Sequence, residues 1–293
     1  MSRLAARAIA RACGRSFPAM LAIWAAQAAG QPTQLSFEAA SAWLGLYIAA
    51  KILDDVQDGD ASFAGEDVPT QTAINLGVAL LFASQRIMVG GPTQPSEPTL
   101  RLALLREVAA VSLAVTQGQQ SSWETTEDAD PLESAWVAAS AKAGLPLCLA
   151  CRLGATSVRA PKRVVDGLGE FGRLLGEALQ AMDDASGVMA RDFADLRLGS
   201  GSLAVAYGLS VAEGRDRDEL NHWLGTCRAG NGTAAARTYE LLEGMGCLRY
   251  LGIEASARLR RARAALDGMA DWLSDDGLAA LRAVADSVDP ARA

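Results

Sequence analysis

The chain has 293 residues, with 27 Lys and Arg against 34 Asp and Glu, and a formal net charge of -7. This acidic excess argues against a surface that binds nucleic acid or an anionic membrane, where clustered positive charge is expected. Half of the residues are apolar and 21% are charged, which excludes broad disorder. Only 5% are aromatic, and Ala and Leu dominate long stretches, so the composition favours helix over sheet.

The predicted elements are helices from one end of the chain to the other. Breaks fall at clusters rich in Gly, Pro, Ser and Thr, at 30–34, 90–98, 125–131 and 197–202. No segment alternates as a strand does, and no shift in composition marks a second domain, so we expect residues 1–293 to form one all-α domain. In chain order the expected helices span 2–13, 17–29, 36–58, 70–89, 98–119, 132–153, 161–189, 202–212, 215–228, 232–245 and 250–286.

The N-terminal segment carries arginines every four residues, at Arg3, Arg7, Arg11 and Arg15, before the apolar stretch 17–29. This spacing places the arginines on one helix face, so the segment is interpreted as part of the fold; a cleaved signal peptide is the alternative. No apolar run approaches the roughly 20 residues of a membrane span, so no span is expected. The five cysteines are typical of reduced thiols, and the protein is predicted to be cytoplasmic.

Two further patterns are assigned to packing and solvation rather than to chemistry. Cys148 and Cys151 form a CxxC, but they lie in an apolar run without a second pair, so we interpret them as core thiols and not as a zinc site. The arginine-rich stretch 257–266 is interpreted as a solvated helix face, with a role in closing the site as the alternative.

Three aspartates, Asp54, Asp55 and Asp58, end the helix predicted at 36–58. Asp54 and Asp58 are four residues apart and therefore share one face. Carboxylates this close repel one another unless a cation lies between them, and Mg2+ binds through carboxylates, waters and phosphate oxygens. The alternative is a solvated acidic helix end in which Lys51 pairs with Asp55 at i,i+4.

A second acidic pair, Asp183 and Asp184, follows another apolar helix, with Gln180 one turn earlier. Two aspartate clusters on two long helices of one bundle can face each other across a cavity. Acidic walls with metal ions then bind an anionic diphosphate, and an apolar interior accommodates an attached hydrocarbon. The sequence therefore predicts a metal-dependent site for a diphosphate that carries a hydrocarbon chain.

Six segments, each weak alone, occur in the order and spacing of a known family. In chain order they are DDVQD at 54–58, Gly65 with Pro69–Thr70, VTQGQ at 115–119, SAKAGLPLCLACRLGA at 140–155, LQAMDD at 179–184 and DLRLGS at 195–200. Over nearly its whole length the chain resembles the trans-isoprenyl diphosphate synthases, the polyprenyl synthetase family. In that family the first and fifth segments read DDxxD and FQxxDD, and the sixth reads DLxxGK.

The resemblance implies the all-α isoprenoid synthase fold, a helical bundle around a central cavity. It also implies a prenyl diphosphate substrate, three Mg2+ ions between the aspartate walls, and a homodimer. Catalysis is expected from Asp54, Asp58 and Asp183. The positions it assigns to metal are Asp54, Asp55, Asp58, Asp183, Asp184 and Gly187. Those it assigns to diphosphate binding are Lys142, Gln180 and Arg191, where Gln180 orients an aspartate or a metal-bound water and Arg191 pairs with Asp195 in the alternative interpretation.

The departures from the family concern the site for isopentenyl diphosphate. Members that add this molecule bind it through a GKxxRP segment, a His or Gln seven residues before DDxxD, and an Arg pair after it. Here Phe17, Tyr47, Phe63 and Ala64 stand at four of these places, and Arg15 replaces the lysine. Such side chains cannot supply the charge-assisted hydrogen bonds, roughly 1.5–3 kcal/mol each, that a diphosphate needs. The isopentenyl site is therefore predicted to be lost and the allylic, metal-binding site to be retained.

The resemblance further implies that the helix ending at Asp54 lines the cavity below the metals. Two alanines, Ala49 and Ala50, leave its first level open, and Trp43 lies six residues deeper than Ala49, about 9 Å along the helix. We therefore predict a cavity floored by Trp43 that prefers a C15 to C20 prenyl diphosphate, with C20 favoured; in the alternative, Trp43 only packs against a neighbouring helix. The residues predicted to line the cavity are Trp43, Leu46, Tyr47, Ala49, Ala50 and Phe63.

Together these features predict an enzyme that ionises a prenyl diphosphate with Mg2+ and lets the carbocation cyclise or lose a proton. This is a class I terpene synthase built on a prenyltransferase scaffold. The alternatives are a chain-elongating polyprenyl diphosphate synthase with a diverged acceptor site, or a ComQ-like transfer to a non-isopentenyl acceptor such as a peptide tryptophan. A non-catalytic partner subunit is a further alternative, against which the intact DDxxD motif and Lys142 argue.

Overall fold

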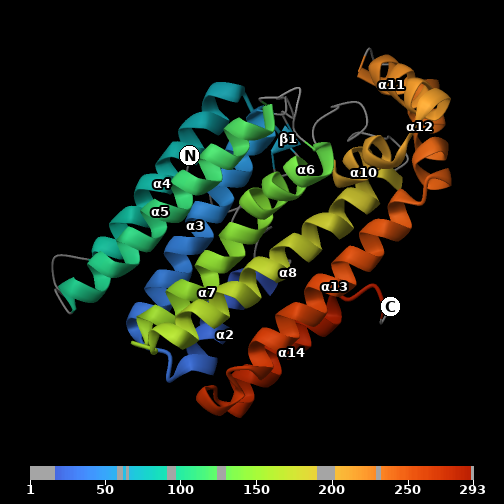
Figure 1. Ribbon diagram of the computed structural model, residues 1–293. Helices are drawn as coiled ribbons and strands as arrows, with labels where there is room; N and C mark the ends of the chain where they lie inside the picture. The colour runs from blue at the N-terminus through green and yellow to red at the C-terminus, as the bar shows by residue number, and fades with distance from the viewer. Residues whose placement is uncertain are drawn as a thin grey trace. The chain divides into compact units, whose positions relative to one another are not determined.

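A computed structural model describes residues 17–57, 62–63, 66–90, 97–123, 130–189, 202–228 and 232–291. The described elements are almost all helices, many of them long (Figure 1), which confirms the predicted all-α class. In chain order the elements are α2 (Phe17–Ala29), α3 (Gln34–Gln57), β1 (Ser62–Phe63), β2 (Glu66–Asp67), α4 (Thr70–Val89), α5 (Pro98–Trp123), α6 (Pro131–Ala139), the π-helical turn η1 (Ser140–Gly144), α7 (Leu145–Ser157), α8 (Lys162–Met189), α10 (Leu203–Val211), α11 (Gly214–Arg228), α12 (Gly232–Gly244), α13 (Cys247–Asp267), the 3-10 turn η2 (Ala270–Trp272) and α14 (Asp275–Ser287).

Three local features differ from the expected helices. Residues 62–63 and 66–67 pair antiparallel, although no strand was predicted. The helix expected at 132–153 contains the π-helical turn η1 between α6 and α7. The helix expected at 250–286 is divided between α13 and α14, because Ser274 caps α14 by accepting a hydrogen bond from the Gly277 N–H at 3.3 Å. The helix expected at 2–13 lies outside the described residues.

The chain divides into two compact units, each assembled from three separate stretches. The first unit consists of Met1–Val111, Pro146–Gly172 and Ala265–Val284. The second unit consists of Ser112–Leu145, Arg173–Ala264 and Ala285–Ala293. Because the chain passes repeatedly from one unit to the other, neither unit is a continuous piece of sequence. The expectation of one domain over residues 1–293 stays a prediction.

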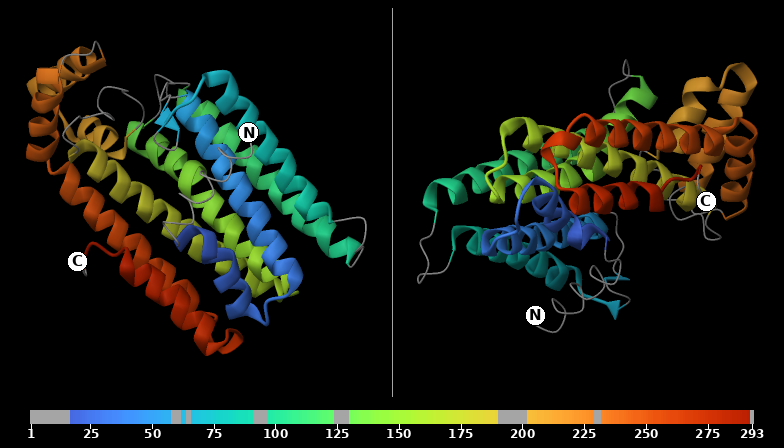
Figure 2. Two further views of the ribbon diagram at one scale, coloured as in Figure 1. Left: turned by 180° about the vertical axis from the view of Figure 1, so that it is seen from behind. Right: turned by 90° about the horizontal axis from the view of Figure 1, so that it is seen from below.

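In the first unit, α3 and α4 pack along their apolar faces, with Ile48, Ile52 and Leu76 in the shared core. Backbones elsewhere in this unit approach closely at glycines. A Cβ added to Gly154 of α7 would lie 2.1 Å from the carbonyl oxygen of Ala22 in α2, which is closer than atoms can pack. Glycine at this position therefore lets α7 lie directly against α2, and Figure 2 shows the same helices from two further sides.

In the second unit, a carboxylate inside the fold is surrounded by arginines. Glu177 of α8 is only 4% exposed and pairs with Arg173 one turn earlier and with Arg258 of α13 at 3.0 Å. The Arg258 guanidinium also lies over the ring of Trp136 at 3.3 Å from its centroid. The interpretation of 257–266 as a solvated face is therefore wrong for Arg258, because this side chain neutralises a buried charge.

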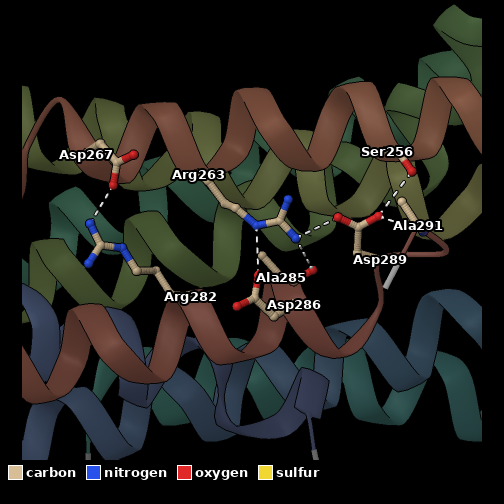
Figure 3. Close-up of polar contacts among 8 residues, drawn as sticks. All are labelled: Ser256, Arg263, Asp267, Arg282, Ala285, Asp286, Asp289 and Ala291. Carbon is tan, nitrogen blue, oxygen red and sulfur yellow. Dashed lines mark hydrogen bonds and ion pairs between the residues drawn. The ribbon is translucent and has the colours of Figure 1, made fainter. Parts of the chain in front are cut away.

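The same interpretation is wrong for Arg263, which joins α13 to the end of the chain (Figure 3). Its guanidinium donates to Asp286 at 2.9 Å and to Asp289 at 2.8 Å. Asp289 is 6% exposed and also accepts hydrogen bonds from the Ser256 hydroxyl and the Ala291 N–H. Asp289 thereby fixes the residues that follow α14 against α13.

Two helical stretches are long and apolar enough to cross a membrane by length and composition alone, Thr70–Val89 and Pro131–Ser157. Of the apolar window in each stretch, 28% is buried within the fold in the first and 44% in the second. Such stretches are weak evidence for a span, because core helices of soluble proteins pass the same test. The expected absence of a membrane span stays a prediction.

We predict that Asp289→Asn lowers the free energy of unfolding at neutral pH, on the order of 1–3 kcal/mol, because hydrogen bonds to a charged group are lost. Burial acts to raise the pKa of Asp289, but the hydrogen bonds from Arg263, Ala291 and Ser256 outweigh it and hold the pKa low. Such stabilisation is complete above the unfolded pKa of about 3.9 and disappears as the pH falls through the lower folded value. Urea unfolding from pH 7 to pH 3 measures both effects.

The control for this prediction is Asp218→Asn, which changes an exposed aspartate of α11. It should leave the unfolding free energy within about 0.5 kcal/mol at every pH. If the Asp289→Asn protein lost stability below pH 4 as steeply as the wild type, the Asp289 carboxylate would not be the source of this pH dependence.

Candidate functional site

The first aspartate motif lies in the last turn of α3. Lys51 Nζ is 2.9 Å from Asp55 Oδ1 and 3.8 Å from Asp54 Oδ2. The side chains of Asp54 and Asp55 are 31% and 22% exposed. The ion pair that the alternative interpretation predicted for Lys51 is therefore present. Asp58, the third aspartate of the motif, lies outside the described residues.

The electrostatics of this helix end favour a bound cation. Carboxylates near a helix C-terminus face the negative end of the helix dipole, and Asp54 and Asp55 also repel each other. Burial acts to lower the pKa of Lys51, but the hydrogen bond to Asp55 and the charges of Asp55 and Asp54 outweigh it and raise the pKa. The two carboxylates thus already converge on a positive charge, and oxygen ligands of this kind suit Mg2+.

The second aspartate motif, near the end of α8, contains one exposed and one buried carboxylate. Asp183 is exposed, whereas Asp184 is 8% exposed. Asp184 accepts hydrogen bonds from Gln180 Nε2 and from the Leu203 N–H, each at 2.6 Å. Leu203 is the first residue of α10, so Asp184 satisfies a backbone donor that the helix itself cannot. Gln180 thereby holds the Asp184 carboxylate in place. Its expected part in diphosphate binding stays a prediction.

Of the other two residues predicted near this motif, the structure describes Gly187 but not Arg191. Gly187 is half-buried on α8, two residues before the helix ends. Arg191 lies outside the described residues. Within the described ranges, no group of three or more His, Cys, Asp or Glu side chains is arranged to hold a metal ion. The described aspartates therefore supply only part of the expected ligand set.

Lys142 lies in the π-helical turn η1, whose position is fixed by contact with α8. A Cβ added to Gly176 of α8 would lie 2.1 Å from the carbonyl oxygen of Ala143. A Cβ added to Gly144 would lie 3.2 Å from the carbonyl oxygen of Arg173. The approach at Gly176 is possible only because this residue is glycine, whereas a side chain at Gly144 would be tight. π-helical turns are common at functional sites.

The face of α3 that carries Asp54 becomes more buried with distance from the aspartates. Ala50 is exposed, Tyr47 is half-buried, and Trp43 is 1% exposed. The Trp43 and Tyr47 rings stack with centroids 5.2 Å apart and planes at 18°. The Trp43 indole N–H donates to the Pro146 carbonyl at 2.7 Å, so the ring is fixed at the buried end of this face.

The other predicted lining residues are distributed along the same region of the first unit. Leu46 and Ala49 are buried, and Phe63 belongs to β1. The sequence argument missed that Tyr47 lies against Trp43. The signal was present, because residues four apart on a helix are neighbours.

Comparison with known proteins now identifies the family. The polyprenyl synthetase family matches residues 3–242 of the chain. The chain belongs to the polyprenyl synthetase family. None of the curated proteins compared with the chain matches it.

Solved structures of this family share the fold. A polyprenyl synthetase from Streptomyces coelicolor A3(2) has 25% identity and a TM-score of 0.78, over 92% of this chain and 82% of that one. A geranylgeranyl pyrophosphate synthetase from Pyrococcus horikoshii Ot3 has 18% identity and a TM-score of 0.80, over 99% and 90%. A polyprenyl synthase from Caulobacter crescentus CB15, solved with calcium and isoprenyl diphosphate, has 22% identity and a TM-score of 0.80, over 98% and 89%.

These comparisons confirm the predicted family and its all-α trans-prenyltransferase fold. Polyprenyl synthetases are enzymes of isoprenoid biosynthesis, so the match supports a function of the prenyltransferase type.

We predict opposite consequences for the two aspartates of α8. Asp184→Ala should lower the free energy of unfolding by about 1–3 kcal/mol, because Gln180 and the Leu203 N–H lose their acceptor. Asp183→Ala should change it by less than about 0.5 kcal/mol, because the side chain is exposed. Urea unfolding in buffer with a metal chelator measures both. Equal losses in the two variants would show that Asp184 does not support α10.

Proposed function

We propose that the protein is a Mg2+-dependent enzyme that ionises an allylic C15–C20 prenyl diphosphate, most simply as a class I terpene synthase. The observation that carries the proposal is that Asp54 and Asp55, at the end of α3 in a polyprenyl synthetase chain, both point to one positive charge, the Lys51 ammonium. The residues proposed as metal ligands are Asp54, Asp58 and Asp183, with Asp55, Asp184 and Gly187 beside them. Bound Mg2+ supplies Lewis-acid stabilisation of the departing diphosphate.

The protein's own groups have distinct tasks in this proposal. The Lys142 ammonium donates to diphosphate oxygens from a turn that the contact with α8 holds in place. Gln180 keeps Asp184 oriented, and Asp184 keeps the start of α10 ordered. Arg191 is proposed as a further donor to the diphosphate. The cytoplasm is the proposed location, since the four described cysteines are free thiols.

Loss of the isopentenyl site is what separates a terpene synthase from a chain-elongating enzyme. Tyr47 stands where the family has His or Gln, and its ring is engaged in the stack on Trp43. A prenyltransferase remains the second candidate, because the similar solved structures are polyprenyl and geranylgeranyl synthases. Its acceptor would be isopentenyl diphosphate or, as in ComQ-like enzymes, a different nucleophile.

We predict that the protein with Mg2+ converts a prenyl diphosphate to a hydrocarbon or alcohol and leaves added isopentenyl diphosphate unconsumed. Gas chromatography with mass spectrometry detects the hydrocarbon or alcohol. Liquid chromatography of the diphosphates measures whether isopentenyl diphosphate is consumed. Asp54→Ala should lower kcat by a factor of about 1,000 or more, because the leaving group loses its metal-held stabilisation.

Asp218→Ala, which removes an exposed carboxylate of α11, is the control and should keep the wild-type rate. Formation of a longer prenyl diphosphate would favour the chain-elongating synthase instead. Inactivity with every diphosphate, alone or with isopentenyl diphosphate, would favour a non-catalytic subunit.

Substrate length is proposed to be set by the Trp43–Tyr47 pair. Tyr47 lies seven residues before Asp54, about 10 Å along the helix, and Trp43 lies one turn further. A prenyl chain that enters past the exposed Ala50 would meet the Tyr47 ring first and the fixed Trp43 ring behind it. This order favours the proposal of an aromatic floor, to which Tyr47 contributes along with Trp43.

We predict that Tyr47→Ala and Trp43→Ala each move the preferred substrate to a longer chain, because removal of a ring extends the space below the aspartates. The values of kcat/KM for C10, C15, C20 and C25 diphosphates measure the shift. Trp43→Phe is the matched control, because it keeps an aromatic ring and loses only the hydrogen bond to Pro146. It therefore separates the effect of the ring's size from the effect of the hydrogen bond. If neither alanine variant shifts the preference while both remain folded by circular dichroism, the pair is not the floor.

A homodimer is proposed from the exposed apolar face of α4. Ile74, Val78, Phe82 and Val89 fall on one side of this helix and are exposed, Phe82 by 66%. A helix that lies on a membrane is typically rich in Lys and Arg on its polar face, whereas α4 contains Arg86 alone. These features favour a second copy of the chain as the cover of this face.

We predict that Phe82→Glu converts the dimer to a monomer, because a carboxylate cannot be buried in an apolar interface without a partner. Sedimentation velocity measures the mass of the particle. Ile253→Glu, at an exposed apolar position of α13, is the matched control and should stay dimeric. A wild-type protein that sediments as a monomer at all concentrations would refute the proposed dimer.

A further inference from the structure

Lys51, beside the first aspartate motif, is neither a proposed metal ligand nor a proposed diphosphate donor. Lys51 lies one turn before Asp55 on α3 and contacts both described aspartates of the motif. The contacts are unequal, because Nζ is within hydrogen-bond distance of Asp55 at 2.9 Å but 3.8 Å from Asp54. Lys51 thus binds one carboxylate directly and the other through charge alone.

Resting on the proposed metal-dependent function, we propose that Lys51 is a positioning residue that serves as the internal counter-cation of this motif. It holds the Asp55 carboxylate to itself and leaves Asp54 as the residue of the pair that meets the metal. Its positive charge also disfavours metal binding to the protein alone. Metal binding then depends more strongly on a diphosphate, whose own negative charge outweighs that of the lysine.

The physical basis is competition between cations for the same carboxylates. Without a metal, an ammonium beside Asp54 and Asp55 relieves both their mutual repulsion and their unfavourable position at a helix C-terminus. A dication on Asp54 shares that carboxylate with Lys51, and two positive charges a few ångströms apart repel even in water. Because Lys51 itself is 62% exposed, solvent and salt reduce this repulsion without abolishing it.

The chain offers a matched pair for comparison. Lys162 pairs with Asp166 at the same i,i+4 spacing, at the start of α8 and in the same unit as Lys51. Asp166 pairs in addition with Arg152. The Lys162–Asp166 pair lies outside both aspartate motifs. Substitution of Lys162 therefore removes the same kind of surface ion pair without changing the charge beside Asp54.

The test measures Mg2+ affinity by isothermal titration calorimetry, with and without inorganic pyrophosphate. Lys51→Met should bind Mg2+ alone about three- to tenfold more tightly than the wild type, with a smaller additional gain from pyrophosphate. Lys51→Arg keeps the charge and should resemble the wild type, as should Lys162→Met. Metal-free Lys51→Met should also melt about 1–2 °C lower, because the carboxylates lose their counter-cation.

The outcomes separate this inference from the proposed function. If the wild type binds Mg2+ and Lys51→Met binds it with equal or lower affinity, the counter-cation role is refuted while the metal-dependent function stands. If the wild type binds no Mg2+ even with pyrophosphate, the proposed function fails and this inference with it. A gain of equal size in Lys162→Met would show that only net charge matters, which also overturns the role of Lys51.

Discussion

The proposed site depends on carboxylates that lie at the C-terminal ends of two helices, α3 and α8. Asp54 and Asp55 lie in the last turn of α3, and Asp183 and Asp184 lie in the last two turns of α8. A helix C-terminus carries partial negative charge, so each pair is disfavoured both by the helix and by its own neighbour. The protein engages the second aspartate of each pair, Asp55 through Lys51 and Asp184 through Gln180 and Leu203. The first aspartate of each pair is the more exposed, which makes it the better placed for an external cation.

Rigid surroundings give these charges fixed positions. In the second unit, the turn that carries Lys142 lies against α8 at Gly176, seven residues before Asp183. One residue further along α8, Glu177 pairs with Arg258, which in turn lies over Trp136. Buried ion pairs are weak evidence for stability, but removal of either partner leaves an unpaired charge inside the fold. The segment of α8 that leads to the aspartates is therefore held on one side by close backbone contact and on the other by charge.

Features that depend on neighbours in the chain could be predicted from the sequence, although some of them were missed, whereas features that depend on distant residues could not. The bounds of α2 and α4 agree with the expected 17–29 and 70–89, because Gly and Pro clusters mark their ends. The division between α13 and α14 was also readable, since Ser274 followed by two aspartates is a typical helix start. The π-helical turn was not predicted, and its close contact with Gly176 of α8 joins residues that are far apart in the chain. Arg258 was assigned to solvent because its partner Glu177 is 81 residues away.

The same distinction applies within the site. The Lys51–Asp55 and Gln180–Asp184 contacts both span four residues of one helix, and both could be anticipated from the sequence. The acceptor of the Trp43 indole, Pro146, is 103 residues away and could not. From the sequence alone, Trp43 was interpreted as either a cavity floor or a packing residue. The hydrogen bond to Pro146 shows that Trp43 packs against its surroundings, and this packing is compatible with a role as the floor. A ring that is hydrogen-bonded behind and stacked against Tyr47 in front cannot easily rotate away, and a surface that measures chain length must be rigid to discriminate. Packing of Trp43 is thus a requirement of the proposed floor.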